Sequence, residues 1–432
     1  MNDVADQPMS AAGSLVGGGS ASAFRDVPYM GVIFVVAEAM KLGFRNGHPD
    51  WSNLGQGQPE VGEMEGAPPR IQSVDLQPDD HAYGPVNGTD DLRQTIADHY
   101  NRLYRDGKAS KYRKENVSVA SGGRLALSRI FAALGTVGAG YQVPDYTAYE
   151  DLFDYHRHRL MPVLLTAREE DGFVIPAAKL EGAIRQNGLG AFLISNPCNP
   201  TGQVVQGDEL RRYVDCGRRF DCAMIFDEFY SHFIYTDDGK PAKGPVSAAA
   251  WVEDVNAEPI LIVDGLTKSF RYPGWRLGWT VGPEEVIDRI GRAASAIDGG
   301  PSTVVQRAAL RVLEPKAADQ ATTALRNVFC HKRNTVIERL SAMGLRVPSK
   351  PNGTFYVWAS TEELKTPFRD PEHFFRAALD NKVLTVPGVF FDVNPGKARK
   401  GPSPLSNWMR FSFGPPEDNM EMGLDRLARM LQ

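Results

Sequence analysis

The chain has 432 residues, of which 42% are hydrophobic and 23% are charged, and its formal net charge is −5. This length and apolar content are enough for one large hydrophobic core and a second, smaller one. The sequence has no basic block and no excess of Lys and Arg, which argues against nucleic-acid binding.

The sequence also carries signals about its compartment. The amino terminus lacks a basic segment followed by an apolar one, and no uncharged apolar run reaches the length of a membrane span. The four cysteines form no CxxC pair and fit no zinc spacing; they are Cys198, Cys216, Cys222 and Cys330. We therefore expect reduced thiols, no metal site, no membrane contact and a cytoplasmic location.

The predicted elements follow in chain order. Residues 1–24 are rich in Gly, Ser and Ala and are expected to be a flexible tail. Apolar residues at helical spacing predict a helix over 29–44, and the Gly- and Pro-rich stretch 51–70 predicts a loop. Short apolar runs alternating with helical segments then predict strands at 116–120, 191–195, 223–226, 260–263 and 279–281. After a long helical stretch from 301, further strands are predicted at 354–358 and 409–413.

This order of elements predicts an α/β fold. Strands separated by helices favour a large domain with a mostly parallel, mixed sheet flanked by helices, and the last third favours a smaller α+β domain. We place the large domain at 76–305 and the small domain at 306–432. The segment 25–75 is expected to be an amino-terminal arm that contributes to the small domain.

Polar motifs follow four of the predicted strands, where open parallel sheets bind their ligands. Gly122 and Gly123 open a helix after the first strand, a pattern that can bind phosphate or form an ordinary tight turn. The run Asn-Pro-Cys-Asn-Pro-Thr-Gly over 196–202 is a stiff, irregular loop, because each Pro restricts the residue before it. Asp227 ends another strand, and a phenol, Tyr230, follows three residues later.

The most specific stretch lies after the strand at 260–263. Lys268 precedes Arg276 by eight residues, with Pro-Gly between them. A buried Lys has a lowered pKa and condenses with carbonyl groups, and the planar fork of an Arg suits phosphate. A solvated surface Lys is the alternative interpretation, but the surrounding motif argues against it.

From about Tyr29 to Leu431 the chain resembles the class I/II aminotransferases, a family of fold-type I pyridoxal-phosphate enzymes. The motifs Asn-Pro-x-Asn-Pro-Thr-Gly, Asp-x-x-Tyr and Lys-x₄-Pro-Gly-x-Arg occur in the family's order. The resemblance implies that Lys268 forms the Schiff base with pyridoxal 5′-phosphate and then shuttles the substrate proton. It also implies that Asp227 pairs with the pyridinium nitrogen, and that Tyr230 and Asn199 hydrogen-bond the ring hydroxyl. The other implied cofactor contacts are Arg276, Gly122, Gly123, Arg124 and Thr267 at the phosphate, Tyr146 stacked on the ring, and Tyr83.

The resemblance extends to the substrate. Arg410 matches the arginine that binds the α-carboxylate of the substrate, and Gly57 and Asn199 match residues close to that group. Tyr83 matches a residue that reaches the phosphate from the neighbouring subunit. We therefore expect a homodimer with shared active sites, whose small-molecule partners are an amino acid and a 2-oxo acid and which binds neither nucleic acid nor membrane.

One position departs from the family pattern, and a second one bears on the choice of substrate. Gly265 occupies a position where many members carry a phosphate-binding Ser, so we expect Thr267 or Arg124 to supply that contact. Asp298 lies in a segment that relatives place near the partner's active site, where a carboxylate would disfavour acidic substrates. Alternatively, Asp298 is solvated or caps a helix.

The expected function is transamination between an α-amino acid and a 2-oxo acid, with neutral or basic donors preferred over acidic ones. An alternative is a related biosynthetic enzyme that cyclises, eliminates, replaces or oxidises after the same proton removal. A regulator with an aminotransferase-like domain is a third class, but residues before Tyr29 are too few for a DNA-binding module.

Overall fold

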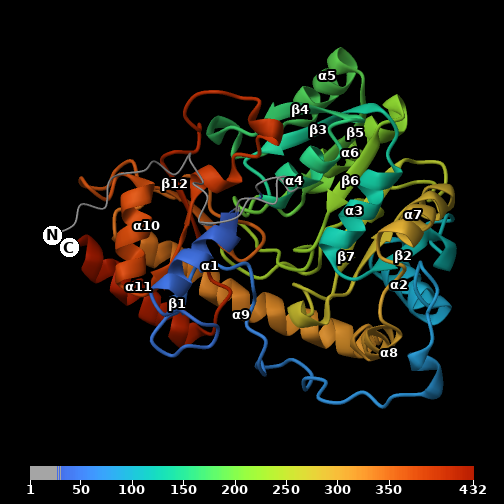
Figure 1. Cartoon of the computed structure of the whole chain (residues 1–432), viewed down its shortest axis with the longest axis horizontal. Coiled ribbons are helices and arrows are strands. Elements are labelled where there is room, and N and C mark those ends of the chain that lie inside the picture. The colour runs from blue at the N-terminus through green and yellow to red at the C-terminus, as the bar shows by residue number, and fades with distance from the viewer. Residues whose placement is uncertain (1–26, 28, 30) are drawn as a thin grey trace, which may run out of the picture.

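The centre of the molecule is a seven-stranded sheet with the strand order β2-β8-β7-β6-β5-β3-β4 (Figure 1). The structure is a computed structural model that describes residues 27, 29 and 31–432. The tail predicted over 1–24 therefore lies outside the described residues. The strands are β2 (Val117–Ala120), β3 (Val137–Val143), β4 (Leu160–Thr166), β5 (Leu189–Ser195), β6 (Ala223–Asp227), β7 (Ile260–Gly265) and β8 (Gly278–Val281).

All neighbouring strands in this sheet run parallel except at β8, which is antiparallel to both β7 and β2. This confirms the predicted mixed, mostly parallel sheet. Strands β3 and β4 were not predicted from the sequence. Gly138 and Gly140 interrupt the first and Pro162 interrupts the second, and these residues are depleted in strands.

Both faces of the sheet are covered, because alternate side chains of each strand point to opposite sides. Leu193 and Ile225 belong to one buried cluster, and Phe192 and Met224 belong to the other. The covering helices are α2 (Asp90–Tyr104), α3 (Gly123–Ala133), α4 (Ala148–Tyr155), α5 (Ala177–Asn187), α6 (Gly207–Phe220), α7 (Glu284–Ile297) and α8 (Thr303–Val312). With both faces covered, the strand ends are where a ligand can reach the sheet.

A second layer of structure lies beside the large sheet and confirms the predicted smaller α+β part. Strands β11 (Val386–Pro387), β12 (Trp408–Ser412) and β9 (Tyr356–Ser360) form an antiparallel sheet. Its helices are α1 (Gly31–Lys41), α9 (Pro315–Ala342), α10 (Pro371–Asp380) and α11 (Glu417–Leu431), and α9 extends between the two parts (Figure 1). The domain boundaries given above remain predictions.

The early and late segments of the chain meet in this second part. Strand β1 (Ser52–Asn53) pairs in parallel with β10 (Val383–Leu384). Helix α11 packs on β1, where the Ser52 hydroxyl donates to the Asn419 carbonyl at 2.7 Å. Gly423 of α11 has no room for a side chain, because a Cβ atom there would overlap Ser52.

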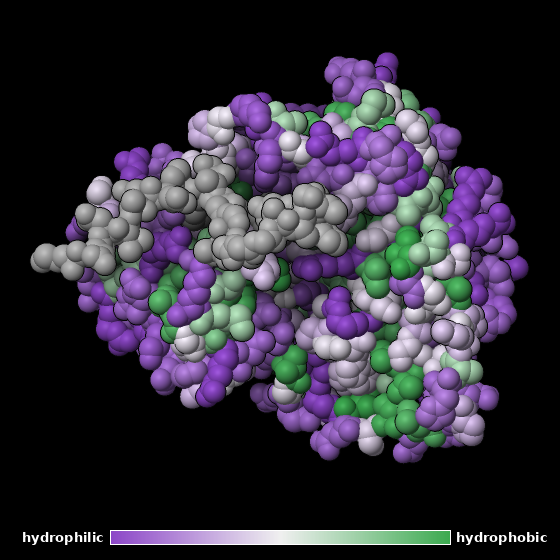
Figure 2. All heavy atoms as spheres, viewed as in Figure 1, coloured by the Kyte–Doolittle hydropathy of each residue, from purple (hydrophilic) through white to green (hydrophobic). Residues whose placement is uncertain are grey.

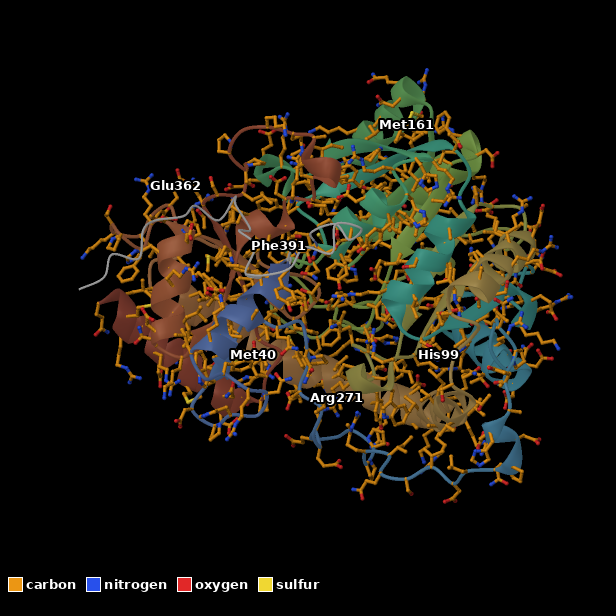
Figure 3. All side chains as sticks on the ribbon, viewed as in Figure 1. Met40, His99, Met161, Arg271, Glu362 and Phe391 are labelled. Atoms are coloured by element: carbon orange, nitrogen blue, oxygen red, sulfur yellow. The ribbon has the colours of Figure 1, made fainter. Side chains whose placement is uncertain are left out.

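The surface is mainly hydrophilic on the face shown in Figure 2, with hydrophobic residues gathered in smaller patches. Figure 3 labels Met40 and Phe391 on the side of the second part, and His99 on the side of the large sheet. Within the described residues, no helix combines the length and the apolar character that crossing a bilayer requires.

Candidate active site

A cavity of about 660 Å³ lies at the carboxyl ends of β5, β6 and β7, bordered by α1 and by the three-stranded sheet. This is the position at which open α/β sheets bind ligands. The cavity brings together most of the predicted site residues, namely Gly57, Gly123, Arg124, Tyr146, Asn199, Asp227, Tyr230, Thr267, Lys268, Arg276 and Arg410.

Lys268 lies on the turn that follows β7, with its amine against the carbonyl oxygen of Gly57. Burial first, and then the positive charges of Arg410, Arg276 and Arg124, lower the pKa of Lys268 to about 7. A substantial fraction of the amine is therefore neutral near neutral pH, and the neutral form is the nucleophile that attacks carbonyl groups.

Asp227 ends β6 and is buried at the floor of the cavity. The hydroxyl of Tyr149 donates to its Oδ2 atom at 2.8 Å. Burial raises the pKa of Asp227 to about 6, so a positively charged partner is needed to keep this carboxylate ionised in a dry site. A protonated pyridine nitrogen has this property. Tyr149 was not predicted; it lies one helical turn after Tyr146, and that spacing was its only sequence signal.

Arg410, on β12, is 1% exposed and is oriented by two acceptors. Its Nη1 donates to the side-chain oxygen of Asn199 at 2.7 Å, and its Nη2 donates to the carbonyl of Gly55. The side-chain NH₂ group of Asn199 is a donor and thus suits a ring hydroxyl. The guanidinium of Arg410 lies 4.1 Å from the ring centre of Tyr356, a second site residue that sequence reasoning missed.

The opposite end of the cavity can bind an anion. Gly122 has φ = +96°, and a Cβ atom there would lie 2.6 Å from Nη2 of Arg276. Gly123 begins α3, so the amino end of this helix faces the same space as Arg276 and Arg124. Backbone amides, a helix terminus and two guanidinium groups are a donor set that fits phosphate.

The packing around Gly265 explains the departure at this position. A Cβ atom on Gly265 would lie 2.5 Å from the carbonyl oxygen of Leu277 and 2.7 Å from Cα of Gly278, so no side chain fits. The hydroxyl of Thr267 is buried and has no hydrogen-bond partner among the described residues. Buried hydroxyl groups are rarely left unpaired, so this atom fits a phosphate oxygen of a bound cofactor.

Tyr146 borders the cavity, and its hydroxyl accepts a hydrogen bond from Nε of Arg124 at 3.1 Å. Its ring packs edge-on against Tyr149, with 5.5 Å between the ring centres. Because Tyr149 also holds Asp227, the aromatic ring and the carboxylate are positioned by the same helix, α4, and its preceding turn.

Three predicted site residues lie outside the cavity lining, namely Gly122, which directly precedes the lining residue Gly123, and Tyr83 and Asp298. Tyr83 is fully exposed to solvent in the single chain. Asp298 accepts two hydrogen bonds from Nη2 of Arg129, at 2.8 and 3.0 Å. Since Arg129 is completely buried and neutralises Asp298, the unpaired carboxylate on which the predicted substrate preference depended is not present in this chain. Asp298 follows the last residue of α7, and its side chain is 12% exposed and paired with Arg129, so it is neither solvated nor the amino-terminal cap of a helix.

Comparisons with known proteins identify a family and a fold for this chain. The sequence model of the family described as aminotransferase class I and II matches residues 49–427. Aspartate aminotransferase from Pyrococcus abyssi is 28% identical over 81% of this chain and 84% of the relative. LL-diaminopimelate aminotransferase from Moorella thermoacetica is 27% identical over 92% of this chain and 93% of the relative. The structure of aspartate aminotransferase from Thermus thermophilus with maleate covers 96% of this chain and 100% of its own, with a TM-score of 0.74 and 24% identity, which supports the fold.

Proposed function

Because the chain belongs to the class I and II aminotransferases, which use pyridoxal 5′-phosphate, we propose that Lys268 forms the Schiff base with this cofactor. The enzyme moves an amino group between an α-amino acid and a 2-oxo acid. One observation carries the assignment of Lys268. Its amine lies in the cavity on the turn after β7, near Asp227 and the lining arginines, and its pKa is lowered to about 7.

The bound cofactor supplies an electron sink for the electrons released at the substrate Cα atom. Asp227 would accept a hydrogen bond from the pyridinium nitrogen, and the hydroxyl of Tyr149, which donates to Asp227, holds this carboxylate in place. Tyr230 and the side-chain NH₂ group of Asn199 donate to the ring hydroxyl. Arg276, Arg124, Thr267 and the backbone at Gly122 and Gly123 would hold the phosphate, and Tyr146 would stack on the ring.

Arg410 binds the α-carboxylate of the substrate through its planar fork. The backbone at Gly57 lies beside the Lys268 amine and limits the space in which the substrate Cα atom can lie. The neutral amine of Lys268 would take the Cα proton from the substrate and give it back at the end of the transfer. The lowered pKa of Lys268 suits this task, because a general base works best near the operating pH.

We propose that neutral or basic amino acids are better donors than aspartate and glutamate. Among the described lining residues the cations are Lys268, Arg124, Arg276 and Arg410, and each already has an anionic or covalent partner in this scheme. The cavity lining includes the apolar residues Val32, Ile33 and Leu127, so an apolar side chain finds contacts there. A donor panel in which aspartate gives the highest kcat/KM would contradict this preference.

We also propose a homodimer in which Tyr83 reaches the phosphate of the neighbouring subunit. The full exposure of Tyr83 supports this, because a phenol without any covering group is available to a second chain. A monomer in sedimentation that retains full activity would contradict it. A cytoplasmic location is supported by four buried cysteines with no disulfide.

The test of Lys268 is reduction with borohydride, followed by peptide mass analysis. The reduced cofactor is expected on Lys268 and not on Lys332, a fully buried lysine that pairs with Glu60 at 2.9 Å. With an amino donor alone, a transaminase converts its cofactor stoichiometrically to the amine form, which changes the absorbance. A return to the starting spectrum with release of a cyclised or eliminated product would indicate one of the alternative reactions instead.

A further inference from the structure

Tyr356 occupies the space between two groups of proposed site residues. It begins β9, is completely buried and borders the cavity. In the antiparallel pair of β9 and β12, Tyr356 is opposite Ser412 and Trp358 is opposite Arg410. Opposed residues share a face, and residues two apart on one strand share it too, so Tyr356 and Arg410 project from the same face.

The side chain of Tyr356 contacts both groups. Its hydroxyl oxygen lies 2.7 Å from that of Tyr230, and its ring lies 4.1 Å below the guanidinium carbon of Arg410. It also approaches the loop beside Lys268 so closely that a Cβ atom on Gly57 would lie 2.5 Å from the Tyr356 hydroxyl. One side chain therefore touches the proposed carboxylate-binding arginine, the proposed ring-binding phenol and the backbone beside the lysine.

The direction of the hydrogen bond between the two phenols follows from counting protons. Each phenol carries one hydroxyl proton. If Tyr230 donates its proton to the ring oxygen of the cofactor, the proton between the two phenols must come from Tyr356. Burial raises the pKa of Tyr356, so this hydroxyl keeps its proton over the working range.

We propose that Tyr356 is a positioning residue that donates to Tyr230 and supports Arg410 from below. This role rests on the proposed function of Lys268, Tyr230 and Arg410. Donation by Tyr356 polarises the Tyr230 hydroxyl and strengthens its own donation to the ring oxygen. The aromatic ring stabilises the guanidinium by a cation–π contact and fixes the plane of its fork. A single side chain thereby links binding of the substrate carboxylate to the electronic state of the cofactor.

Two substitutions at this position separate the two contacts. Tyr356→Phe removes the hydroxyl and keeps the ring, whereas Tyr356→Leu removes both. The matched control is Tyr235→Phe, because Tyr235 is 1% exposed and its hydroxyl donates to the carbonyl of Thr354 at 2.8 Å, outside the cavity lining. The control therefore loses one buried phenol hydrogen bond of the same kind, and it should affect stability alone.

The first readout is the pH titration of the absorbance of the bound cofactor, without substrate. A weaker donor at the ring oxygen makes that oxygen more basic, so the proton at the Lys268 linkage is held more tightly. The midpoint pH of this absorbance titration is therefore expected to rise in Tyr356→Phe by roughly half a pH unit to one pH unit. A shift of this size corresponds to the free energy of one modest hydrogen bond. Tyr235→Phe should leave the midpoint unchanged.

The second readout is the division between kcat and KM. Tyr356→Phe is expected to lower kcat by roughly three- to tenfold and to leave KM for the amino donor nearly unchanged. Tyr356→Leu is expected to raise KM as well, by roughly tenfold, because Arg410 loses its aromatic support. An unmoved midpoint in Tyr356→Phe, or an equal rise of KM in both variants, would overturn the role of Tyr356. If borohydride fails to label Lys268 in the wild-type enzyme, the proposed function itself is wrong, so the two failures are distinguishable.

Discussion

Replacing Asp298 with an asparagine tests whether this residue stabilises the fold or selects the substrate. Arg129 lies on α3, in the helix that begins at the proposed phosphate turn. Its Nη1 donates to the Val119 carbonyl at 2.7 Å, and its Nη2 donates to both oxygens of Asp298. The Arg129 side chain is 0% exposed and that of Asp298 is 12% exposed, so the pair is nearly dry.

The expected loss of stability follows from the burial of this ion pair. Removing one partner of a buried ion pair leaves an uncompensated charge and costs about 3 to 5 kcal/mol. The amide in Asp298→Asn would keep one acceptor oxygen and some access to water, so we expect the free energy of unfolding to fall by about 3 kcal/mol. The matched control is Asp319→Asn. Asp319 accepts two hydrogen bonds from Arg102, at 2.8 and 2.9 Å, but both side chains are well exposed. The control should lose less than about 1 kcal/mol.

The assay combines two measurements on the cofactor-loaded enzyme. Urea denaturation followed by circular dichroism compares the stability of the two variants with that of the wild type. A donor panel compares kcat/KM for aspartate with kcat/KM for a neutral amino acid, and this ratio should change by less than about threefold in Asp298→Asn. If Asp298→Asn is as stable as Asp319→Asn and the ratio shifts strongly toward aspartate, Asp298 selects the substrate and the structural explanation is wrong.

Three further predictions concern buried groups. Gly265→Ser places an atom 2.5 Å from the Leu277 carbonyl and should lower the free energy of unfolding by roughly 2 kcal/mol or more, measured in urea; unchanged stability would contradict the packing explanation. Burial lowers the pKa of His99 to about 4, so the wild type loses stability as the pH falls from 6.5 to 4, because only the unfolded chain gains this proton. The stability of His99→Phe relative to the wild type should therefore rise by about 3 kcal/mol over that range in a pH series, and parallel curves would refute the argument. Tyr149→Phe removes the hydrogen bond that stabilises the ionised carboxylate of Asp227 and should weaken cofactor binding by roughly tenfold in a titration of the cofactor-free protein, whereas equal affinity would exclude this role.

The sequence predicted those parts of the site that follow strands. Asn199, Asp227 and Lys268 each come after an apolar run, and parallel strands bring such positions to one edge. Strand β3 was missed because its two glycines hide the apolar pattern. A local sequence pattern is therefore sufficient to predict a site residue when that residue directly follows a parallel strand.

The rest depends on contacts between distant segments. The phenols of Tyr230 and Tyr356 are 126 residues apart in the chain, and their contact requires β9 to pair with β12 in one particular register. The partner of Asp298 is 169 residues away, and nothing in the local sequence distinguishes Arg129 from a surface arginine. Spacing and composition carry no information on such pairs. The two phenols meet through packing between the two sheets, and Arg129 meets Asp298 through the contact of α3 with α7.

The pairing of β1 with β10 has a consequence for biosynthesis. Strand β1, at residues 52 and 53, obtains its neighbour strand only at 383 and 384 and its covering helix only at 417–431. The large sheet is complete at Val281, so it can form while the ribosome is still adding the remainder. At typical rates of synthesis of about 5 to 20 residues per second, the early segment waits roughly 15 to 65 s for its partner strand. The wall of the cavity that contains Gly57 and Arg410 is therefore closed only when the last helix has left the ribosome.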